Sequence, residues 1–274
     1  SDGSDLVNHG SRCEENALRM QSTANRVLMA PPPVELFREM VHTVVRLNSR
    51  FIPPYGYGAT LYIRPLLIGT SPEVGVKPSD EYLLIMFVVP VGPYFKAGFK
   101  PVDMMICRDF DRAAPQGTGT VKVGGNYAAS LQSLAIAKKA GYSSTIYLDA
   151  KEKKYIDECG PANFFGIKNK TYITPQSESI LPSITNKSLQ QLAEHLGYKV
   201  ERRPVPFEEL SEFEEVAECG TAAVITPIRK IVDPIANRTF TYGDPEVPGP
   251  VCTELYNVYT AIQFGETEDV FGWT

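Results

Sequence analysis

The stretch GTGTVKVGGNYAASL, residues 117–131, sets one lysine, Lys122, among four glycines and directly before a segment with helical spacing. A P-loop ends in Gly-Lys-Ser/Thr, because its N–H groups wrap a phosphate and its hydroxyl meets magnesium. Here Val121 precedes the lysine and Val123 follows it, so the pattern does not match. The dinucleotide pattern GxGxxG does not match either. The glycines alone therefore do not identify a phosphate cradle.

The two valines that flank Lys122 suggest a different role for it. Apolar neighbours predict that the lysine is buried, and burial lowers the pKa of a lysine and favours the neutral, nucleophilic amine. Such an amine can form a covalent bond with a carbonyl group. Gly124 and Gly125 would let another group approach the backbone closely. On spacing alone, a lysine in a surface loop is the commoner explanation of the same pattern.

Composition describes a globular protein. The 274 residues carry a net charge of −5 and are 43% hydrophobic, which gives a sizeable core and no basic footprint for nucleic acid. The five cysteines are widely spaced, odd in number and without a CxxC pair, so we expect neither a metal site nor disulfides. No apolar run reaches the roughly 20 residues of a membrane span, and residues 1–11 are polar and lack the apolar core that a signal peptide has. We expect a cytoplasmic protein that binds neither membrane nor nucleic acid.

Periodicity predicts five helices. Apolar residues recur every three or four positions over 14–29, and the prolines at 31–33 end that helix. Further helices are predicted over 34–48, 126–140, 185–196 and 251–264. Asn126 and Thr185 are the expected N-caps of two of them, and Gly141 and Gly197 follow their C-termini.

Runs rich in Val, Ile, Leu and Tyr, bounded by Gly, Pro and Asp, predict the strands. They cover 60–69, 80–91, 102–107, 144–150, 163–168, 171–175, 198–205, 221–228 and 230–233. The pair 163–168 and 171–175 is predicted to be a hairpin. The fold class is therefore mixed α/β in two domains: a small domain over 1–89, a loop over 90–97 that is rich in Pro and Gly, and a large domain over 98–274.

Several motifs together resemble one family. In chain order they are LYIRPLLIG, KVGGNYAASL, ECGPANFF, LPSITNKSL and CGTAAVITPIR. They resemble the branched-chain aminotransferases of the fold-type IV class of pyridoxal-phosphate (PLP) enzymes, from about Glu14 to the C-terminal FGETEDVFGW. The resemblance implies a small α/β domain and a larger domain with a pseudo-barrel sheet and flanking helices. It also implies reversible transamination between L-leucine, L-isoleucine or L-valine and 2-oxoglutarate, in a homodimer.

The resemblance also implies the residues that hold the cofactor. Lys122 would form the covalent bond to PLP and carry the proton during turnover, and Tyr127 would bind the phenolic oxygen of the cofactor. Glu158, preferred over its neighbour Asp157, would keep the pyridine nitrogen protonated. The phosphate would be bound by Ile184 and Thr185 at a helix N-terminus and by Thr221, as these are the family's phosphate-binding positions. Without the resemblance, Thr185 would simply be a helix N-cap.

The implied substrate-binding residues come from two parts of the chain. They are Tyr62, Arg64, Tyr94, Thr221 and Ala222. Tyrosine rings would form an apolar wall, and Arg64 could reach the distal carboxylate of glutamate. No metal is implied.

Two departures from the family pattern lead to alternatives. Family members begin with roughly 60 to 80 further residues, which include an arginine for the cofactor phosphate, and residues 1–13 hold no counterpart of it. A chain lacking them is expected to retain PLP poorly and to have little activity.

The CxxC pair that some members carry after the GTA motif is replaced by Ala-Val-Ile, which predicts no thiol switch. Within the enzyme class, a D-amino-acid aminotransferase or an aminodeoxychorismate lyase is the alternative.

Overall fold

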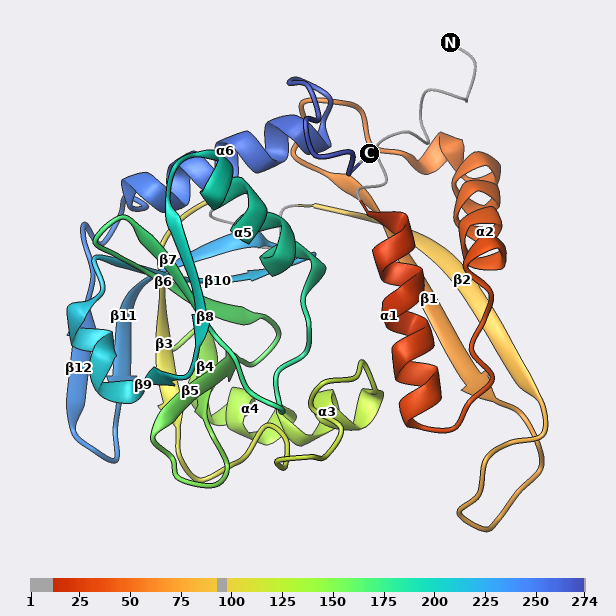
Figure 1. Cartoon of the computed structure of the whole chain (residues 1–274), viewed down its shortest axis with the longest axis horizontal. Coiled ribbons are helices and arrows are strands. Elements are labelled where there is room, and N and C mark those ends of the chain that lie inside the picture. The colour runs from red at the N-terminus through yellow and green to blue at the C-terminus, as the bar shows by residue number, and fades with distance from the viewer. Residues whose placement is uncertain (1–11, 93–97, 274) are drawn as a thin grey trace. The chain divides into compact units, whose positions relative to one another are not determined.

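The computed structural model describes residues 12–92 and 98–273 (Figure 1). The chain forms two compact units, one of Ser1–Lys96 with Ala261–Thr274 and one of Ala97–Thr260. This division differs from the expected one at the C-terminus, which had been assigned to the large domain. The reason is local packing, because the ring of Phe264 lies 5.9 Å from that of Tyr55 and the guanidinium of Arg12 lies 5.7 Å from the ring of Trp273.

The first unit consists of two helices, a short 3₁₀ turn and one long hairpin. Its elements are α1 (Cys13–Arg26), α2 (Val34–Leu47), η1 (Ser49–Phe51), β1 (Thr60–Gly69) and β2 (Tyr82–Val91). The strands pair antiparallel from Thr60 opposite Val91 to Gly69 opposite Tyr82. Helix α1 packs on α2, and α2 packs on β2. The sequence predictions for both helices and both strands are confirmed to within a few residues.

The second unit is built on one mixed sheet. Its strands are β3 (Val102–Cys107), β4 (Ser144–Leu148), β5 (Tyr155–Cys159), β6 (Asn163–Lys168), β7 (Thr171–Pro175), β8 (Lys199–Arg203), β9 (Val205–Pro206), β10 (Glu215–Gly220), β11 (Val224–Asp233) and β12 (Arg238–Thr241). The order is β8-β7-β6-β10-β11-β3-β4-β5-β9, with β12 beside β11. The pairs β11/β3, β3/β4 and β7/β8 are parallel. Strands such as β6 and β7 are buried over nearly their whole length, and their sequences are rich in apolar residues.

The predicted hairpin of β6 and β7 is confirmed. The two strands pair antiparallel, and the connecting Asn169 and Lys170 have φ of 49° and 57°. Positive φ at both central residues is the two-residue turn whose twist matches that of the strands. Strands β5, β10 and β12 were not predicted, because acidic or basic residues interrupt their apolar pattern.

The helices of the second unit are α3 (Gly124–Ala129), α4 (Leu131–Lys139), α5 (Ile184–His195) and most of α6 (Pro250–Gln263), whose residues from Ala261 onward belong to the first unit, with the 3₁₀ helix η2 (Phe207–Glu212). In Figure 1, α3 and α4 follow one another, and α4 packs on β4 and β3 while α5 packs on β8 and β10. Both predicted caps are wrong. Asn126 lies inside α3, and Ser183, not Thr185, caps α5 by accepting a hydrogen bond from the N–H of Asn186. The predicted C-terminal glycines, Gly141 and Gly197, have φ of 90° and 83°.

Among the described residues, no helix is long and apolar enough to cross a membrane. Within the same residues, no group of three or more His, Cys, Asp or Glu side chains could hold a metal ion.

Candidate functional site

Lys122 and Tyr127 meet across the turn between the glycine-rich loop and α3. The lysine Nζ donates a hydrogen bond of 2.7 Å to the tyrosine hydroxyl and lies 4.9 Å from the centre of its ring. Val121 is buried while Lys122 is exposed, so the expectation that the lysine itself is buried is wrong. The loop therefore anchors through the valine and presents the amine and the phenol together.

The loop keeps this shape because of Asn126. Its side chain is buried and donates to the carbonyl oxygens of Thr118, at 2.7 Å, and Val121, at 2.9 Å. The Thr118 hydroxyl donates to the Asn126 Oδ1 at 2.8 Å. An amide that binds two carbonyls of a preceding loop holds that loop against the helix. Asn126 is thus the anchor that sets the direction of Lys122.

The glycine of the loop with the least room for a side chain is not one of the pair after the lysine. A Cβ on Gly119 would lie 2.2 Å from the carbonyl oxygen of Ser179, far inside contact distance. A Cβ on Gly124 or Gly125 would meet no protein atom within 4 Å in the described residues. Close approach therefore occurs at Gly119, where the lysine loop packs on the segment that leads into α5.

Glu158, at the end of β5, is a buried carboxyl with three hydrogen-bonding partners. Its Oε1 pairs with the Arg112 Nη2 at 2.8 Å and accepts from the Leu181 N–H at 3.0 Å. Its Oε2 accepts from the Asn163 side chain at 2.8 Å. Burial raises the pKa of Glu158 to about 7, although Arg112, the Leu181 N–H and Asn163 act in the opposite direction. The carboxyl therefore changes charge near neutral pH.

The neighbouring acid, Asp157, is used differently. It accepts hydrogen bonds from the hydroxyls of Ser177, at 2.8 Å, and Ser179, at 2.7 Å. Burial raises the pKa of Asp157 too, and the two serines partly offset this. Both of its oxygens are thus occupied with holding the segment before α5, which supports the choice of Glu158 over Asp157 as a group that faces a ligand.

A chain of buried amides links Glu158 to the start of α5. Asn163, which donates to Glu158, accepts at its Oδ1 from the Asn186 side chain at 3.2 Å. Asn186 also donates to the Thr174 hydroxyl at 2.9 Å and accepts from the Tyr172 hydroxyl at 2.8 Å. This network is fully buried, so it fixes the first turn of α5 relative to the carboxyl.

The first turn of α5 contains Ile184 and buried Thr185. The N–H groups of a first helical turn have no acceptor within the helix, and the helix dipole favours an anion there. Ser183 occupies only the N–H of Asn186, at 3.2 Å. The turn therefore offers donors to an anionic group.

Thr221 and Ala222 lie in the tight connection between β10 and β11, and both are exposed. The connection closes on Val224, which pairs with Gly220 and has φ of 60°. A β-branched residue in the left-handed region is strained, because its Cβ crowds the backbone. The turn that carries Thr221 therefore ends in a residue whose conformation the surrounding structure must hold in place.

The two substrate-binding candidates of the first unit lie together on β1. Tyr62 and Arg64 are two residues apart, so they share one face of the strand, and the guanidinium carbon lies 5.0 Å from the tyrosine ring centre. Phe87 is paired with Arg64 and Val89 with Tyr62 on β2. This face is apolar with one cation. Tyr94 lies outside the described residues.

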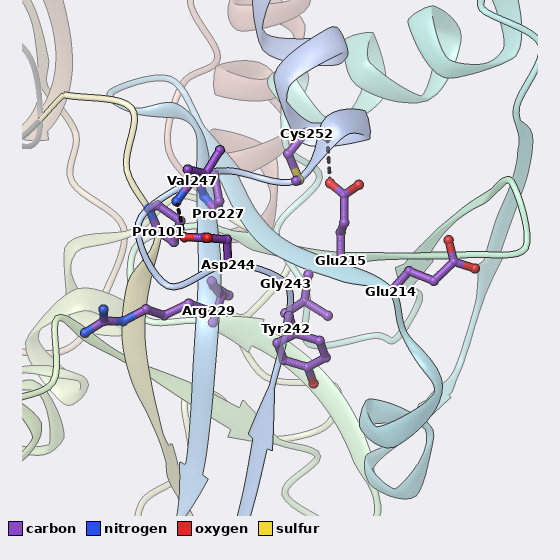
Figure 2. A pocket seen from close by; sticks show the side chains of 13 residues that line it. Pro101, Glu214, Glu215, Pro227, Arg229, Tyr242, Gly243, Asp244, Val247 and Cys252 are labelled. Atoms are coloured by element: carbon purple, nitrogen blue, oxygen red, sulfur yellow. Dashed lines mark hydrogen bonds between the residues drawn. The ribbon is translucent and has the colours of Figure 1, made fainter.

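A small pocket occurs elsewhere in the second unit. Figure 2 shows it beside β10, β11 and the start of α6, where the Glu215 carboxylate accepts from the N–H of Cys252. No predicted site residue lines it. Glu215 caps a helix there, which is a structural role.

Comparison with known proteins decides the family. Residues 7–231 match the model of the amino-transferase class IV family. The chain belongs to the class IV aminotransferases. A protein of this family from Helicobacter pylori named branched-chain-amino-acid aminotransferase is 48% identical over 262 residues, which are 94% of this chain and 76% of the relative.

Solved structures of class IV aminotransferases share the fold. The branched-chain amino acid aminotransferase of Escherichia coli superposes with a TM-score of 0.82 at 31% identity, covering 96% of this chain and 83% of the other. The enzyme of the same name from T.th., solved with pyridoxamine 5'-phosphate, also gives 0.82, at 26% identity over 96% and 82% of the two chains. The expected fold class is confirmed.

Sequence reasoning missed three residues of this site. Arg112 stands in a polar loop, RDFDRAAPQ, whose pattern is that of a solvated turn. The local sequence predicts a helix cap at Asn126, and nothing in it distinguishes Gly119 from the other glycines of the loop. Nothing in the local sequence reveals that Arg112 is buried, since its partners Glu158 and Ser179 are far along the chain.

Proposed function

We propose that the chain catalyses reversible transamination between L-leucine, L-isoleucine or L-valine and 2-oxoglutarate, with PLP as its cofactor. The 48% identity to a branched-chain-amino-acid aminotransferase over most of the chain supports the substrate class. The amine of Lys122 and the phenol of Tyr127, 2.7 Å apart, are the observation that most supports the cofactor and the type of reaction.

The residues of the second unit fit PLP as a donor set. They comprise a primary amine for an aldehyde, a phenol beside it, a buried carboxyl for a pyridine nitrogen and a helix N-terminus for a phosphate. When bound, PLP supplies an electron sink that stabilises negative charge on the substrate Cα. The chain's own residues bind and orient the reactants and move the protons.

Lys122 has two tasks in this proposal. Its Nζ is the group that would hold the cofactor, through a covalent bond to the aldehyde carbon, and the same amine would serve as the acid–base group that moves a proton at the substrate Cα. Tyr127 orients the amine through the 2.7 Å hydrogen bond and places its hydroxyl to bind a phenolic oxygen next to the same carbon. The exposed position of the lysine leaves it accessible to both reactants.

Glu158 holds a proton on the pyridine nitrogen as long as it is ionised itself. Ile184 and Thr185, with the first turn of α5, and Thr221 bind the phosphate. The strained turn at Val224 keeps Thr221 and Ala222 in place. These assignments are supported by the buried network that ties Glu158 to α5 through Asn163 and Asn186.

Substrate recognition is proposed for Tyr62 and Arg64, with Tyr94, and for the backbone of Thr221 and Ala222. The apolar face of β1 and β2 around Tyr62 suits a branched aliphatic side chain, and the Arg64 guanidinium suits the distal carboxylate of glutamate. The face around Tyr62 and Arg64 could thus accept the side chains of both amino donors.

A substrate panel tests the proposal. Purified chain with PLP is incubated with 2-oxoglutarate and each of L-leucine, L-isoleucine, L-valine and D-alanine, or with aminodeoxychorismate alone, and the 2-oxo acid formed from each compound is measured. We expect turnover with the three branched L-amino acids only. Activity confined to D-alanine, or release of pyruvate from aminodeoxychorismate, would show a different class IV reaction. Absence of PLP binding would favour a chain without catalytic function.

We further propose that the protein is a homodimer and cytoplasmic. Light scattering during size-exclusion chromatography measures the mass of the assembly directly, and a monomeric mass at micromolar concentration would contradict the homodimer.

A further inference from the structure

The buried Arg112 is the least explained charge beside the proposed cofactor site. Its side chain is 6% exposed and lies between two acceptors that are distant in sequence. The Nη2 pairs with Glu158 at 2.8 Å, and the Nη1 donates to the carbonyl oxygen of Ser179 at 2.7 Å. Burying a guanidinium is costly unless both its charge and its donors are satisfied. Here the planar guanidinium pairs its charge with the Glu158 carboxylate and also donates to a carbonyl oxygen in a fixed geometry that a lysine lacks.

The hydrogen bonds at Glu158 show what this pairing achieves. A carboxylate has about four lone-pair sites. Within the described residues, Oε1 accepts hydrogen bonds from the Arg112 guanidinium and the Leu181 N–H, and Oε2 accepts one from the Asn163 side chain alone. One lone pair of Oε2 is therefore left for a further donor, and the three partners fix the plane of the carboxylate in which that lone pair lies.

The second acceptor of Arg112 connects the carboxylate with the lysine loop. The Ser179 carbonyl that receives the Nη1 is also the group against which Gly119 packs. Arg112 and Gly119 thus meet the same carbonyl group. One side chain joins the carboxyl of Glu158 to the loop that carries Lys122.

We infer that Arg112 is a positioning residue, which keeps Glu158 ionised and oriented toward a pyridine nitrogen and sets the lysine loop in register with it. This inference rests on the proposed function for the identity of the ligand. Protonated Glu158 would present an O–H instead of a lone pair, and could not hold a proton on a ring nitrogen. In the part of the chain that the structure describes, the ionisable groups near Glu158 are Arg112, Asp157, Cys159 and, beyond Cys159, Cys219 and Glu218, and Arg112 is the one cation of this set.

The direct test is the ionisation of Glu158 in the cofactor-free protein. Carbon-13 NMR of labelled glutamate carboxyls is followed against pH in wild type, Arg112→Gln and Arg112→Lys, and the Glu158 resonance is assigned by its loss in Glu158→Gln. An adjacent cation lowers a carboxyl pKa by about 1 to 3. Since burial already raises the pKa of Glu158 to about 7, loss of the cation should reduce its ionised fraction at pH 7 from about one half to about one tenth or less.

Arg108→Met is the matched control. Arg108 stands in the same loop and forms a part-buried ion pair with Asp233 at 2.7 Å, away from Glu158. It should leave the titration of Glu158 unchanged. Arg112→Lys should keep Glu158 largely ionised but lose the bond to Ser179. An unchanged pKa in Arg112→Gln would overturn the inference.

Turnover supplies the second readout, which also serves if Arg112→Gln does not fold. Arg112→Lys should lower kcat at least tenfold in wild type and by a smaller factor in Glu158→Gln, because the part of the loss that acts through the carboxyl is already absent there, while the part that acts through Ser179 remains. Equal losses in the two backgrounds would mean that Arg112 is merely structural. If the pKa of Glu158 shifts in Arg112→Gln but the wild type shows no transamination, the proposed function is contradicted and the positioning of Glu158 by Arg112 stands. If the wild type transaminates but the pKa of Glu158 does not shift, only the role of Arg112 is contradicted.

Discussion

Replacing Gly119 with alanine tests how the lysine loop is held. The added Cβ would lie 2.2 Å from the Ser179 carbonyl oxygen and must move to at least the 3.4 Å of an ordinary contact, a displacement of about 1.2 Å. The carbonyl cannot yield easily, because Arg112 binds it at 2.7 Å and Asp157 binds the Ser179 hydroxyl at 2.7 Å. Overpacking of this kind lowers the free energy of unfolding by about 1 to 3 kcal/mol. Because the Ser179 carbonyl is held rigidly, we expect a loss of about 3 kcal/mol.

The expected loss is measured by urea unfolding of the cofactor-free protein, followed by far-ultraviolet circular dichroism. Gly125→Ala is the control, since its Cβ meets no protein atom within 4 Å and alanine favours a helix over glycine by about 0.5 to 1 kcal/mol. A loop displaced by about 1 Å should also lower kcat roughly 100-fold. If Gly119→Ala unfolds within about 0.5 kcal/mol of wild type and stays fully active, the close approach does not position the lysine.

Three further changes address other parts of the site. Asn126→Ala should destabilise the cofactor-free protein by about 1 to 3 kcal/mol in the same unfolding assay, because the buried carbonyls of Thr118 and Val121 lose their donor; an unchanged midpoint would refute the anchor. Val224→Gly should stabilise it by about 1 kcal/mol by relieving the strain at φ of 60°, while turnover falls as the turn loosens; a loss of stability would show that the valine is not strained. The third concerns pH: because burial raises the pKa of Glu158 from 4.5 to about 7, protonated Glu158 contributes stability that is complete below pH 4.5 and is lost as the pH rises through 7. Wild type should therefore lose about 3 kcal/mol relative to Glu158→Gln over that window, and parallel pH profiles would contradict this.

Much of the fold follows from local sequence. Continuous apolar runs such as those of β1 and β6 predict their strands, and the turn residues Asn169 and Lys170 mark a hairpin. The failures are strands whose side chains carry charges that are satisfied only in three dimensions. In β5, Asp157 and Glu158 are buried against serines and an arginine from remote loops, which a pattern of polar residues cannot reveal.

The site divides in the same way. The motif around Lys122 and Tyr127 predicts a pair that the structure brings within 2.7 Å. The residues that hold this pair in place act through backbone carbonyls, as Asn126 and Arg112 do, or through the absence of a side chain, as Gly119 does. Carbonyl positions depend on the path of the whole chain, so short-range spacing gave the wrong role for Asn126 and none for the other two.

The central claim is that Lys122 bonds covalently to the cofactor, and reductive trapping tests it most directly. The protein is loaded with PLP, reduced with borohydride, digested and mapped by mass spectrometry, with Lys122→Ala treated in parallel. We predict a reduced cofactor on the peptide that contains Lys122, and neither label nor aldehyde–amine absorbance band in the variant. Label on another lysine, or an unchanged band and turnover in Lys122→Ala, would contradict the account.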